Sequence, residues 1–557
     1  MMLSHTDPAT IYVGANKLFK TTDRGQTWSA ISGDLTTALD RDTVELMGVK
    51  GKDIKIAKND GVAQYGALFS IAESWKRPGL VWTGSDDGFV HVTRDGGATW
   101  TNVTPRIAGA PKFAYVSKVE PSRAAEGTVY VSFDAHRTGD YATYLYASTD
   151  YGTSFRSIAS NLPKGEVVRT VTEDQKNPDV LYVGSETGLW VSVDRGKAWT
   201  RVRANLPTVP VYEITQHSRE NAMILATHGR AIWILDDMTP FQGWTQAQSR
   251  DGWVYGSKPA TLRLKTSDQE RSFQGDMLFL GENPPMAATI AYLTKTKPDS
   301  VRVEIKDAAG VVVRQVKGDT AKATRPGLGL NLAKWDLRVE PWPEPKGGAP
   351  AAENPFGGGG GREGPYVLPG TYVATVIVNG KAIGATDVVV RSDPESQISA
   401  ADRKANFELS KELQALGGRL TDAVTAVKQV NTQLAAIRKE LGDSTKTPAA
   451  YRAPLDSLTK MVAPLKRKLL VRDEGEEVEF TSEMFREVLP FKVGGLTGDL
   501  GGFLAGPTAQ NLRTMEELRK EVPAAVTETN ALVERFTALV KQLSDAGLYP
   551  AMPKPVK

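Results

Sequence analysis

The chain has 557 residues, with 68 lysines and arginines against 65 aspartates and glutamates, which gives a formal net charge of +3. This near balance gives no basis for binding to nucleic acid or to a membrane surface. No run of about 18 apolar residues occurs, so we expect no transmembrane helix. The first ten residues lack the basic and apolar regions of a signal peptide. The absence of cysteine excludes disulfides and thiolate metal ligands.

A short motif recurs four times before residue 200. It consists of Ser/Thr-x-Asp-x-Gly with an aromatic residue three positions after the glycine, and each copy follows a short apolar run that ends in a turn. A fifth apolar run, residues 223–237, carries no such box. The box residues are Asp23, Gly25 and Trp28; Asp95, Gly97 and Trp100; Asp150, Gly152 and Phe155; and Asp194, Gly196 and Trp199.

The segments around each box alternate apolar and polar residues between turn residues, which predicts short β-strands. Four short antiparallel strands repeated at roughly 40 to 70 residues are typical of a β-propeller blade. We therefore predict a partial propeller of about five blades in residues 1–245. We expect three strands in its last blade and no strand from the N-terminus closing the ring.

The carboxylate of each box has a structural and a catalytic interpretation. An Asp side chain accepts hydrogen bonds from N–H groups of its own turn, the glycine supplies a positive φ, and the aromatic ring fills space between blades. Four aspartates in one repeated role fit a structural need better than one active site. We predict that Asp95→Ala and Asp194→Ala lower thermal stability without changing ligand binding.

Residues 246–395 keep the strand pattern but lose the box. About seven short strands in this length predict a β-sandwich, similar to immunoglobulin and fibronectin type III modules. The Asn379-Gly380 pair predicts a type I′ hairpin turn. The segment 342–365 is rich in Gly and Pro, which predicts a disordered loop. Its glycine run is not a phosphate-binding loop, because no Lys-Ser/Thr follows.

Residues 396–557 change to a heptad pattern of apolar residues in three runs. The runs begin near Leu409, Leu455 and Met515. They predict an antiparallel α-helical bundle, although each run would also serve as an oligomerisation surface. Pro523 within the third run predicts a kink or a helix start.

The box segments resemble the Asp-box, or BNR, repeat of sialidase-like and sortilin-type propellers. Residues 226–240, "ATHGRAIWILDDMTP", and residues 281–293, "GENPPMAATIAYL", resemble signatures of a bacterial family often labelled glycosyl hydrolase or sortilin N-terminal domain proteins. The resemblance implies a secreted or periplasmic protein with more blades than are found here. The chain is therefore similar to the C-terminal half of such a protein, which implies a missing N-terminal propeller half.

The turns between the second and third strands of each blade lie at the opposite end from the boxes. Their polar residues are Asp86, Asp87, Asp134, His136, Arg137, Asp140, Glu186, His228 and Arg230. We expect these side chains, Asp140 aside, to gather around one concave mouth and bind a ligand. The insertion between Thr36 and Tyr65 should emerge beside them, since long insertions are more often functional than idle.

Two functions follow from this surface. The first is a binding or scaffold protein that engages a polypeptide or a glycan through the face opposite the boxes. The alternative is a glycoside hydrolase that uses a carboxylate pair, Asp86 or Asp87 with Asp134 or Glu186. The arginine cluster and Tyr/Glu pair of a sialidase are not found. We expect no cofactor and no metal, because no His pair has ligand spacing and the Asp-x-Asp-x-Asp loop of calcium sites is absent from the sequence.

Overall fold

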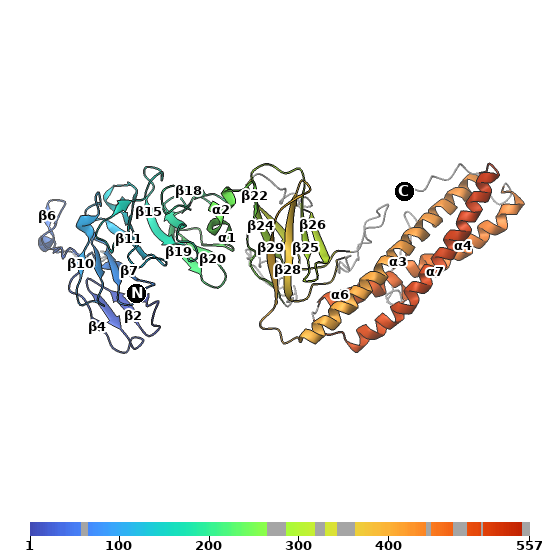
Figure 1. Ribbon diagram of the computed structural model, residues 1–557, viewed down its shortest axis with the longest axis horizontal. Helices are drawn as coiled ribbons and strands as arrows, with labels where there is room; N and C mark the ends of the chain where they lie inside the picture. The colour runs from blue at the N-terminus through green and yellow to red at the C-terminus, as the bar shows by residue number, and fades with distance from the viewer. Residues whose placement is uncertain are drawn as a thin grey trace. The chain divides into compact units, whose positions relative to one another are not determined.

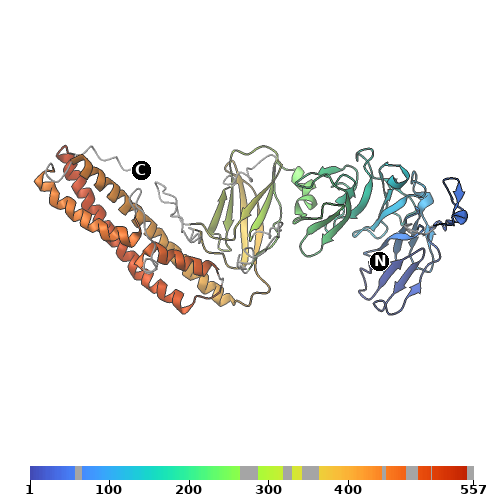
Figure 2. The same ribbon diagram turned by 180° about the vertical axis from the view of Figure 1, so that it is seen from behind.

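The computed structural model describes residues 1–56, 65–263, 286–317, 329–341, 363–441, 447–471, 487–502 and 505–548. The chain divides into two compact units, Met1–Asp251 and Gly252–Lys557. The first unit is built of small antiparallel sheets, and the second combines sheets with a C-terminal helical region (Figures 1 and 2). The structure thus confirms a mainly β chain followed by helices.

Five antiparallel sheets follow one another along the first unit, and in each sheet strands adjacent in sequence pair with each other. The first sheet contains β1 (Met2–Leu3), β2 (Ile11–Gly14), β3 (Leu18–Thr21) and β4 (Ser29–Ala30). The second contains β7 (Leu68–Glu73), β8 (Val81–Ser85), β9 (Val90–Thr93) and β10 (Thr101–Asn102). The third contains β11 (Tyr115–Pro121), β12 (Val129–Asp134), β13 (Tyr144–Ser148) and β14 (Arg156–Ser157). The fourth contains β15 (Val168–Glu173), β16 (Leu181–Ser185), β17 (Leu189–Ser192) and β18 (Thr200–Val202). The fifth contains only β19 (Val211–His217), β20 (Ala222–Thr227) and β21 (Ile232–Leu235).

Successive sheets pack face to face around apolar clusters. The first strands β11, β15 and β19 each lie against the first two strands of the sheet before them, and β7 lies against β2. Because a sheet packs on each side of them, β8, β9, β16 and β17 bury both of their faces and are buried throughout. Each pair of neighbouring sheets shares one apolar cluster, which is formed by side chains from both sheets.

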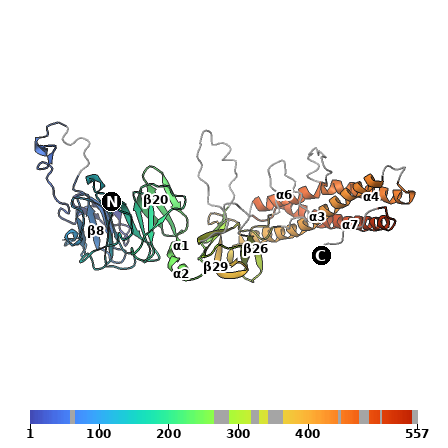
Figure 3. The same cartoon turned by 90° about the horizontal axis from the view of Figure 1, so that it is seen from above.

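The connections of the first unit carry further short elements. The insertion after the first sheet contains the hairpin β5 (Glu45–Leu46) and β6 (Val49–Lys50) and the 3-10 helix η1 (Gly51–Asp53), and Figure 3 shows this hairpin standing away from the sheets. Two more 3-10 helices, η2 (Thr104–Arg106) and η3 (His136–Thr138), lie in later connections. After β21 the chain forms α1 (Thr239–Gln242) and α2 (Trp244–Gln248).

Two sheets of the second unit enclose one apolar core. The smaller has the order β22 (Gly252–Val254), β24 (Ala288–Thr294) and β27 (Gly329–Trp335). The larger has the order β23 (Ala260–Leu262), β29 (Lys381–Ser392), β28 (Gly370–Val378), β25 (Val301–Lys306) and β26 (Val312–Lys317). Ile290 and Trp335 of the smaller sheet and Val303 and Val376 of the larger belong to the shared core.

One sequence prediction for this unit, the hairpin turn at Asn379-Gly380, has a direct counterpart. Asn379 (φ 49°) and Gly380 (φ 79°) join β28 to β29, as a type I′ turn requires. The strand β23 pairs parallel with β29, an arrangement that the hairpin pattern did not predict. Residues 342–362 of the predicted disordered loop, and residues 281–285 of the second signature segment, lie outside the described residues.

The helical region consists of α3 (Ala400–Leu441), α4 (Ala449–Leu469), α6 (Leu489–Gly502) and α7 (Ala509–Asp545). The three heptad runs fall on α3, α4 and α7, and their apolar residues share one buried cluster with those of α6. Of the two alternatives predicted at Pro523, a kink or a helix start, the helix start is wrong, because α7 begins at Ala509 behind a Thr508 capping box and continues through Pro523.

Candidate functional site

The box turns join the third and fourth strands of the first four sheets. In the second sheet, Asp95 Oδ1 accepts hydrogen bonds from Thr93 Oγ1 (2.8 Å) and from the Thr99 N–H (2.9 Å), and Asp95 Oδ2 accepts one from Thr99 Oγ1 (2.6 Å). These bonds, chiefly the one from the Thr99 hydroxyl, lower the pKa of Asp95 to about 2. The carboxylate is exposed, but both of its oxygens serve its own turn.

The other box turns repeat these contacts with one exception. Asp23 and Asp150 accept the same set of hydrogen bonds, from Thr27 and Ser154 at the fourth position after the aspartate. Asp194 has Ala198 at that position, so it accepts bonds from Ser192 Oγ (2.8 Å) and from backbone N–H groups only. The fourth box therefore lacks one side-chain hydrogen bond that the others have.

The aromatic residues of the boxes reach the preceding sheet. Trp100 Nε1 donates to the Ile31 carbonyl at 2.9 Å, and Trp199 Nε1 donates to the Ile158 carbonyl at 2.8 Å. Trp28, in the first sheet, bonds its own Gly25 carbonyl instead and is 42% exposed. Each ring therefore packs against a neighbouring sheet wherever the described residues provide one.

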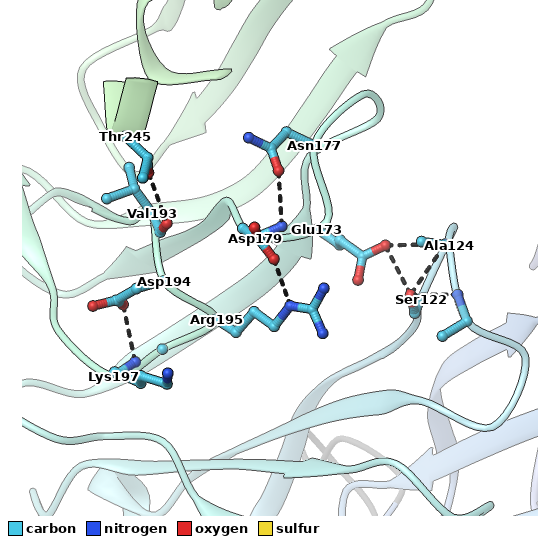
Figure 4. A network of polar contacts seen from close by, with 12 residues as sticks. Ser122, Ala124, Glu173, Asn177, Asp179, Val193, Asp194, Arg195, Lys197 and Thr245 are labelled. Carbon is cyan, nitrogen blue, oxygen red and sulfur yellow. Dashed lines mark hydrogen bonds and ion pairs between the residues drawn. The ribbon is translucent and has the colours of Figure 1, made fainter. Parts of the chain in front are cut away.

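Carboxylates at the same end of the sheets fasten neighbouring sheets to each other. Glu173, at the end of β15, accepts bonds from Ser122 Oγ (2.8 Å) and the Ala124 N–H (3.2 Å), which follow the first strand of the third sheet (Figure 4). It also accepts a bond from Tyr130 OH of that sheet (3.0 Å). Glu73 accepts a bond from Tyr12 OH of the first sheet at 3.0 Å. This end of the sheets is thus occupied by internal hydrogen bonds.

At the opposite end, the first strands of four sheets share a β-bulge. The pairing register of each of these strands shifts by one residue, directly after Leu68 in β7, Val116 in β11, Val168 in β15 and Val211 in β19. A bulge redirects the side chain of its extra residue and is common beside functional sites. The bulge residues are Phe69, Ser117, Arg169 and Tyr212.

Arg169 is the centre of an ion-pair cluster at this end. Its guanidinium is 7% exposed and binds the carboxylate of Asp134, which is 4% exposed, and that of Glu186, which is 43% exposed. Arg169 Nε lies 3.0 Å from Glu186 Oε2. Asp134 also accepts hydrogen bonds from the His136 N–H (3.0 Å) and ring Nδ1. Residues from three chain segments are therefore held together by one buried cation.

Aromatic rings flank the cluster on both sides. The Arg169 guanidinium lies 4.8 Å from the ring centre of Tyr212, a distance typical of a cation–π interaction, and Tyr212 in turn lies 5.4 Å from the ring of His228. On the other side, Arg137 lies 5.5 Å from the ring centre of Tyr115, whose ring contacts Phe69 at 4.6 Å. Together these residues form one set, which we call the Arg169 surface. Its members are Phe69, Tyr115, Asp134, His136, Arg137, Arg169, Glu186, Tyr212 and His228.

Several charged groups of the Arg169 surface lie near the hydroxyl of Tyr115. Burial raises the pKa of Tyr115, Arg137 acts in the opposite direction, and the carboxylates of Asp134 and Asp86 and the hydroxyl of Tyr212 raise it further. Phe69 is 64% exposed and Tyr212 is 44% exposed, so two large rings face solvent beside the charges.

Asp86 and Asp87 hold the chain segment inserted after the first sheet. Asp87 is 1% exposed, and its Oδ2 accepts bonds from the Thr37 N–H (2.8 Å) and Oγ1 (2.6 Å). Asp86 Oδ1 accepts bonds from the N–H groups of Gly66 (2.9 Å) and Ala67 (2.8 Å). Both carboxylates are thus acceptors for the two ends of the insertion.

The predicted site residues are therefore only partly brought together. Asp134, His136, Arg137, Glu186 and His228 belong to the Arg169 surface. Asp86 acts on Tyr115 through its charge, whereas Asp87 is buried beneath the insertion. Arg230 is exposed, and its backbone carbonyl accepts a bond from Trp233 Nε1. Asp140 accepts bonds from Tyr144 OH and the Ala142 N–H.

Sequence reasoning missed Phe69, Tyr115, Arg169 and Tyr212. A signal was present, because the four first strands align as "LFS", "VSK", "VRT" and "VYE". The middle position varies between Phe, Ser, Arg and Tyr while the first is always apolar. An interpretation by strict alternation of period two overlooks that position, because a bulge shifts the alternation by one residue.

Within the ranges that the structure describes, no three His, Asp or Glu side chains are grouped closely enough to hold a metal ion. No helix in these ranges combines the length and apolar character needed to cross a membrane.

Comparison with known proteins shows distant structural likenesses only. No protein-family model and no curated protein matches the chain. The GH74 xyloglucanase from Xanthomonas campestris is 18% identical, over 42% of this chain and 35% of that chain, with a TM-score of 0.32. The Niastella koreensis GH74 enzyme is 13% identical, over 69% of this chain and 58% of that one, with a TM-score of 0.25. YCF48 from Cyanidioschyzon merolae is 15% identical, over 41% and 66%, with a TM-score of 0.22.

The chain spans 35% of the xyloglucanase and 38% of an ancestral GH74 enzyme. At such identities and TM-scores, no activity or ligand is transferred to this chain.

Proposed function

We propose that the first unit is part of an Asp-box β-propeller whose Arg169 surface binds a polypeptide or glycan ligand. The partial propeller comprises residues 1–245, followed by a β-sandwich in 246–395 and a helical bundle in 396–557. The observation that carries the binding proposal is the pairing of a rigid, buried ion cluster with two exposed aromatic rings. Aromatic side chains on a rigid support are the usual anchors of binding sites, because little conformational entropy is lost when they contact a ligand.

The contacts of the carboxylates favour binding over hydrolysis. A glycoside hydrolase needs one carboxyl group that donates a proton and a second that acts as base or nucleophile. Asp134 and Glu186 instead accept N–H bonds from one guanidinium, and Asp86 and Asp87 accept backbone N–H bonds. Each candidate thus already serves as an acceptor within the protein. Glu186 alone combines substantial exposure with a place in the cluster, so it is the residue for testing hydrolysis.

The test uses the full chain against two immobilised probe sets, a panel of oligosaccharides and a library of 15-residue peptides. Tyr212→Ala and Phe69→Ala should each weaken binding to the recognised probe at least tenfold. Trp28→Ala is the control, because Trp28 is an aromatic residue at a box turn whose exposed fraction, 42%, is close to the 44% of Tyr212. Its affinity should equal that of the unmodified protein.

Two results would overturn the proposal. One is the absence of binding to both probe sets, or binding that Tyr212→Ala and Phe69→Ala leave unchanged. The other is release of reducing sugar from an oligosaccharide that Glu186→Gln abolishes without changing the melting temperature. That second result would assign the surface to a hydrolase.

A further inference from the structure

The helix α6 lies beside α3 and α7 and completes one part of the helical bundle. Asn406 of α3 and Glu517 of α7 contact it. Further along the same two helices, Arg438 of α3 and Glu528 of α7 contact α4 instead. Figures 1 and 3 show α4 and α6 along different parts of the α3–α7 pair. Each of these two shorter helices therefore serves as a third helix for one part of the pair.

Three glycines lie in the interior of α6, at Gly494, Gly495 and Gly498. Inside a helix, each glycine lowers the equilibrium constant for helix formation roughly fivefold relative to alanine. Glycine is useful in a helix where another segment approaches too closely for a Cβ atom. At these three positions, no described atom outside the helix backbone lies within 4 Å of an added Cβ. Packing within the described residues therefore does not require the glycines.

The helical state of α6 depends on its docking. A helix of 14 residues is marginal in water even when it is rich in alanine. The docked face consists of four apolar side chains that are at most 3% exposed, namely Leu489, Val493, Leu496 and Leu500. Near the end of the helix, Asn406 Nδ2 donates to the Leu500 carbonyl at 3.2 Å. Lys492 adds ion pairs with Glu517 and Glu521, which are 56% and 38% exposed and so contribute little.

The pair of α3 and α7 has contacts of its own that do not involve α6. The two helices contain 42 and 37 residues and pack against each other, and both also contact α4. In addition, Arg519 Nε and Nη2 of α7 donate to the two carboxylate oxygens of Glu412 of α3, both at 2.7 Å. Such a bidentate pair fixes the register of the two helices. Their folded state is therefore supported by more contacts than that of α6.

We infer that α6 leaves the bundle and unfolds as a unit while α3, α4 and α7 stay folded, so that the bundle has a closed and an open state. A segment held by few contacts opens at a lower free energy than the domain as a whole. The interior glycines raise the population of the open state, in which apolar side chains that α3 and α7 share with α6 become accessible. This inference concerns the second unit and does not depend on the function proposed for the first.

Hydrogen exchange of the full chain, followed by mass spectrometry, measures the opening. Amides of residues 489–502 should exchange at least about tenfold faster than those of 409–434 and 515–540. Gly498→Ala should slow the exchange of α6 roughly fivefold, because alanine favours the helix in the closed state. Gly418→Ala in α3 is the matched control, since an added Cβ there also meets no described atom within 4 Å. It should leave the exchange of α6 unchanged, because Gly418 is helical in both states.

Thiol labelling gives a second readout of the open state. Because the chain has no cysteine, Leu496→Cys introduces its only thiol, on the docked face of α6. A thiol reagent should modify this variant faster than Val427→Cys, which places the thiol at a buried position of α3. Adding Gly498→Ala should slow the labelling of Leu496→Cys roughly fivefold, whereas adding Gly418→Ala should not change it. The exchange experiment needs no substitution in the core, so it tests the inference even if Leu496→Cys keeps α6 open.

Two results would overturn the inference. If the amides of α6 exchange no faster than those of α3 and α7, the helix opens only when the whole bundle unfolds. If Gly418→Ala slows the exchange of α6 as much as Gly498→Ala does, the opening of α6 includes the unfolding of α3, and no separate open state exists.

Discussion

The two ends of the sheets in the first unit differ in how far they repeat. At the box end, Asp23, Asp95 and Asp150 have the same hydrogen-bond partners at the same positions. At the opposite end, the four bulge residues are a phenylalanine, a serine, an arginine and a tyrosine. Contacts that every copy needs are repeated in every copy. The bulge residues differ from copy to copy at the same backbone position. The fold therefore does not depend on their identity, and they are free to serve ligand binding.

The largest expected effect is at the variable end. Arg169→Met leaves the Asp134 carboxylate buried without its cation, which should lower the free energy of unfolding by about 3–5 kcal/mol. Urea denaturation measures this change. Arg195→Met is the matched control, because the pair of Arg195 with Asp179 is 60% and 52% exposed and such surface pairs contribute about 1 kcal/mol or less. Equal losses in the two variants would show that the Arg169 cluster is not a buried support.

Lowering the pH should reduce the free energy of unfolding through His91, which lies near the Arg169 end of the second sheet. Burial lowers the pKa of this 9% exposed imidazole from 6.5 to about 4, and Asp87 opposes the change. Below pH 6.5 the unfolded chain therefore binds a proton that the folded chain does not, so stability falls as the pH drops from 6.5 to about 4. The loss attributable to His91 is about 3 kcal/mol.

His91→Gln should remove this part of the pH dependence. The measurement is the free energy of unfolding at several pH values between 4 and 7, for the variant and the unmodified protein. Phe89→Leu, which changes the ring beside His91 and keeps the imidazole, is the control. A His91→Gln profile parallel to that of the unmodified protein would contradict the prediction.

At the box end, substitutions at two adjacent glycines distinguish the cost of backbone strain from the cost of lost packing between sheets. Gly96 and Gly97 both have positive φ, but only Gly97 would place a Cβ against the preceding sheet, 2.7 Å from the Ile31 carbonyl oxygen. Gly96→Ala should cost about 1 kcal/mol for its φ alone, and Gly97→Ala should cost more. Thermal unfolding compares the two variants. Equal losses would mean that the box glycine has no role between sheets.

Asp95→Ala tests the box carboxylate itself. Removing it leaves the Thr99 N–H and two hydroxyls without their acceptor in an exposed turn, so the midpoint of thermal unfolding should fall by less than for Gly97→Ala. Affinity for any ligand of the Arg169 surface should stay the same, because that surface lies at the other end of the sheet. An unchanged midpoint with lost function would give Asp95 a functional role instead.

The smallest effect restores the missing contact of the fourth box. Ala198→Thr supplies the hydroxyl that Thr27, Thr99 and Ser154 give in the other boxes. It should raise the free energy of unfolding by at most about 1 kcal/mol, the net value of one hydrogen bond. Ala198→Val has a similar shape without the hydroxyl and serves as the control. If both variants are equally stable, the boxes do not depend on this bond.

The sequence was most informative where contacts are local. The strands, the box turns and the three heptad runs follow from periodicity and turn residues within a few positions. The helix α6 escaped notice because its sequence "VGGLTGDLGG" contains glycines that lower helix propensity, and its helical state depends on packing against α3 and α7.

The candidate site was less predictable because its contacts join distant residues. Arg169 meets Asp134 across 35 positions, and Asp87 meets Thr37 across 50. Nothing in either local sequence indicates its partner. Asp86 and Asp87 attracted a catalytic interpretation as adjacent carboxylates, and their actual partners are the two ends of the inserted segment.

Those two carboxylates also make residues 38–65 a natural place for engineering. Thr37 and Gly66, at the two ends of this stretch, are fixed to adjacent residues of one turn. Because the ends are already held, the entropic cost of a longer connection rises only with the logarithm of its length, by about 0.6 kcal/mol per doubling. A tag or a small folded domain inserted here should leave the five sheets intact, which offers a way to immobilise the protein through the end that carries the Arg169 surface and to leave the box end free.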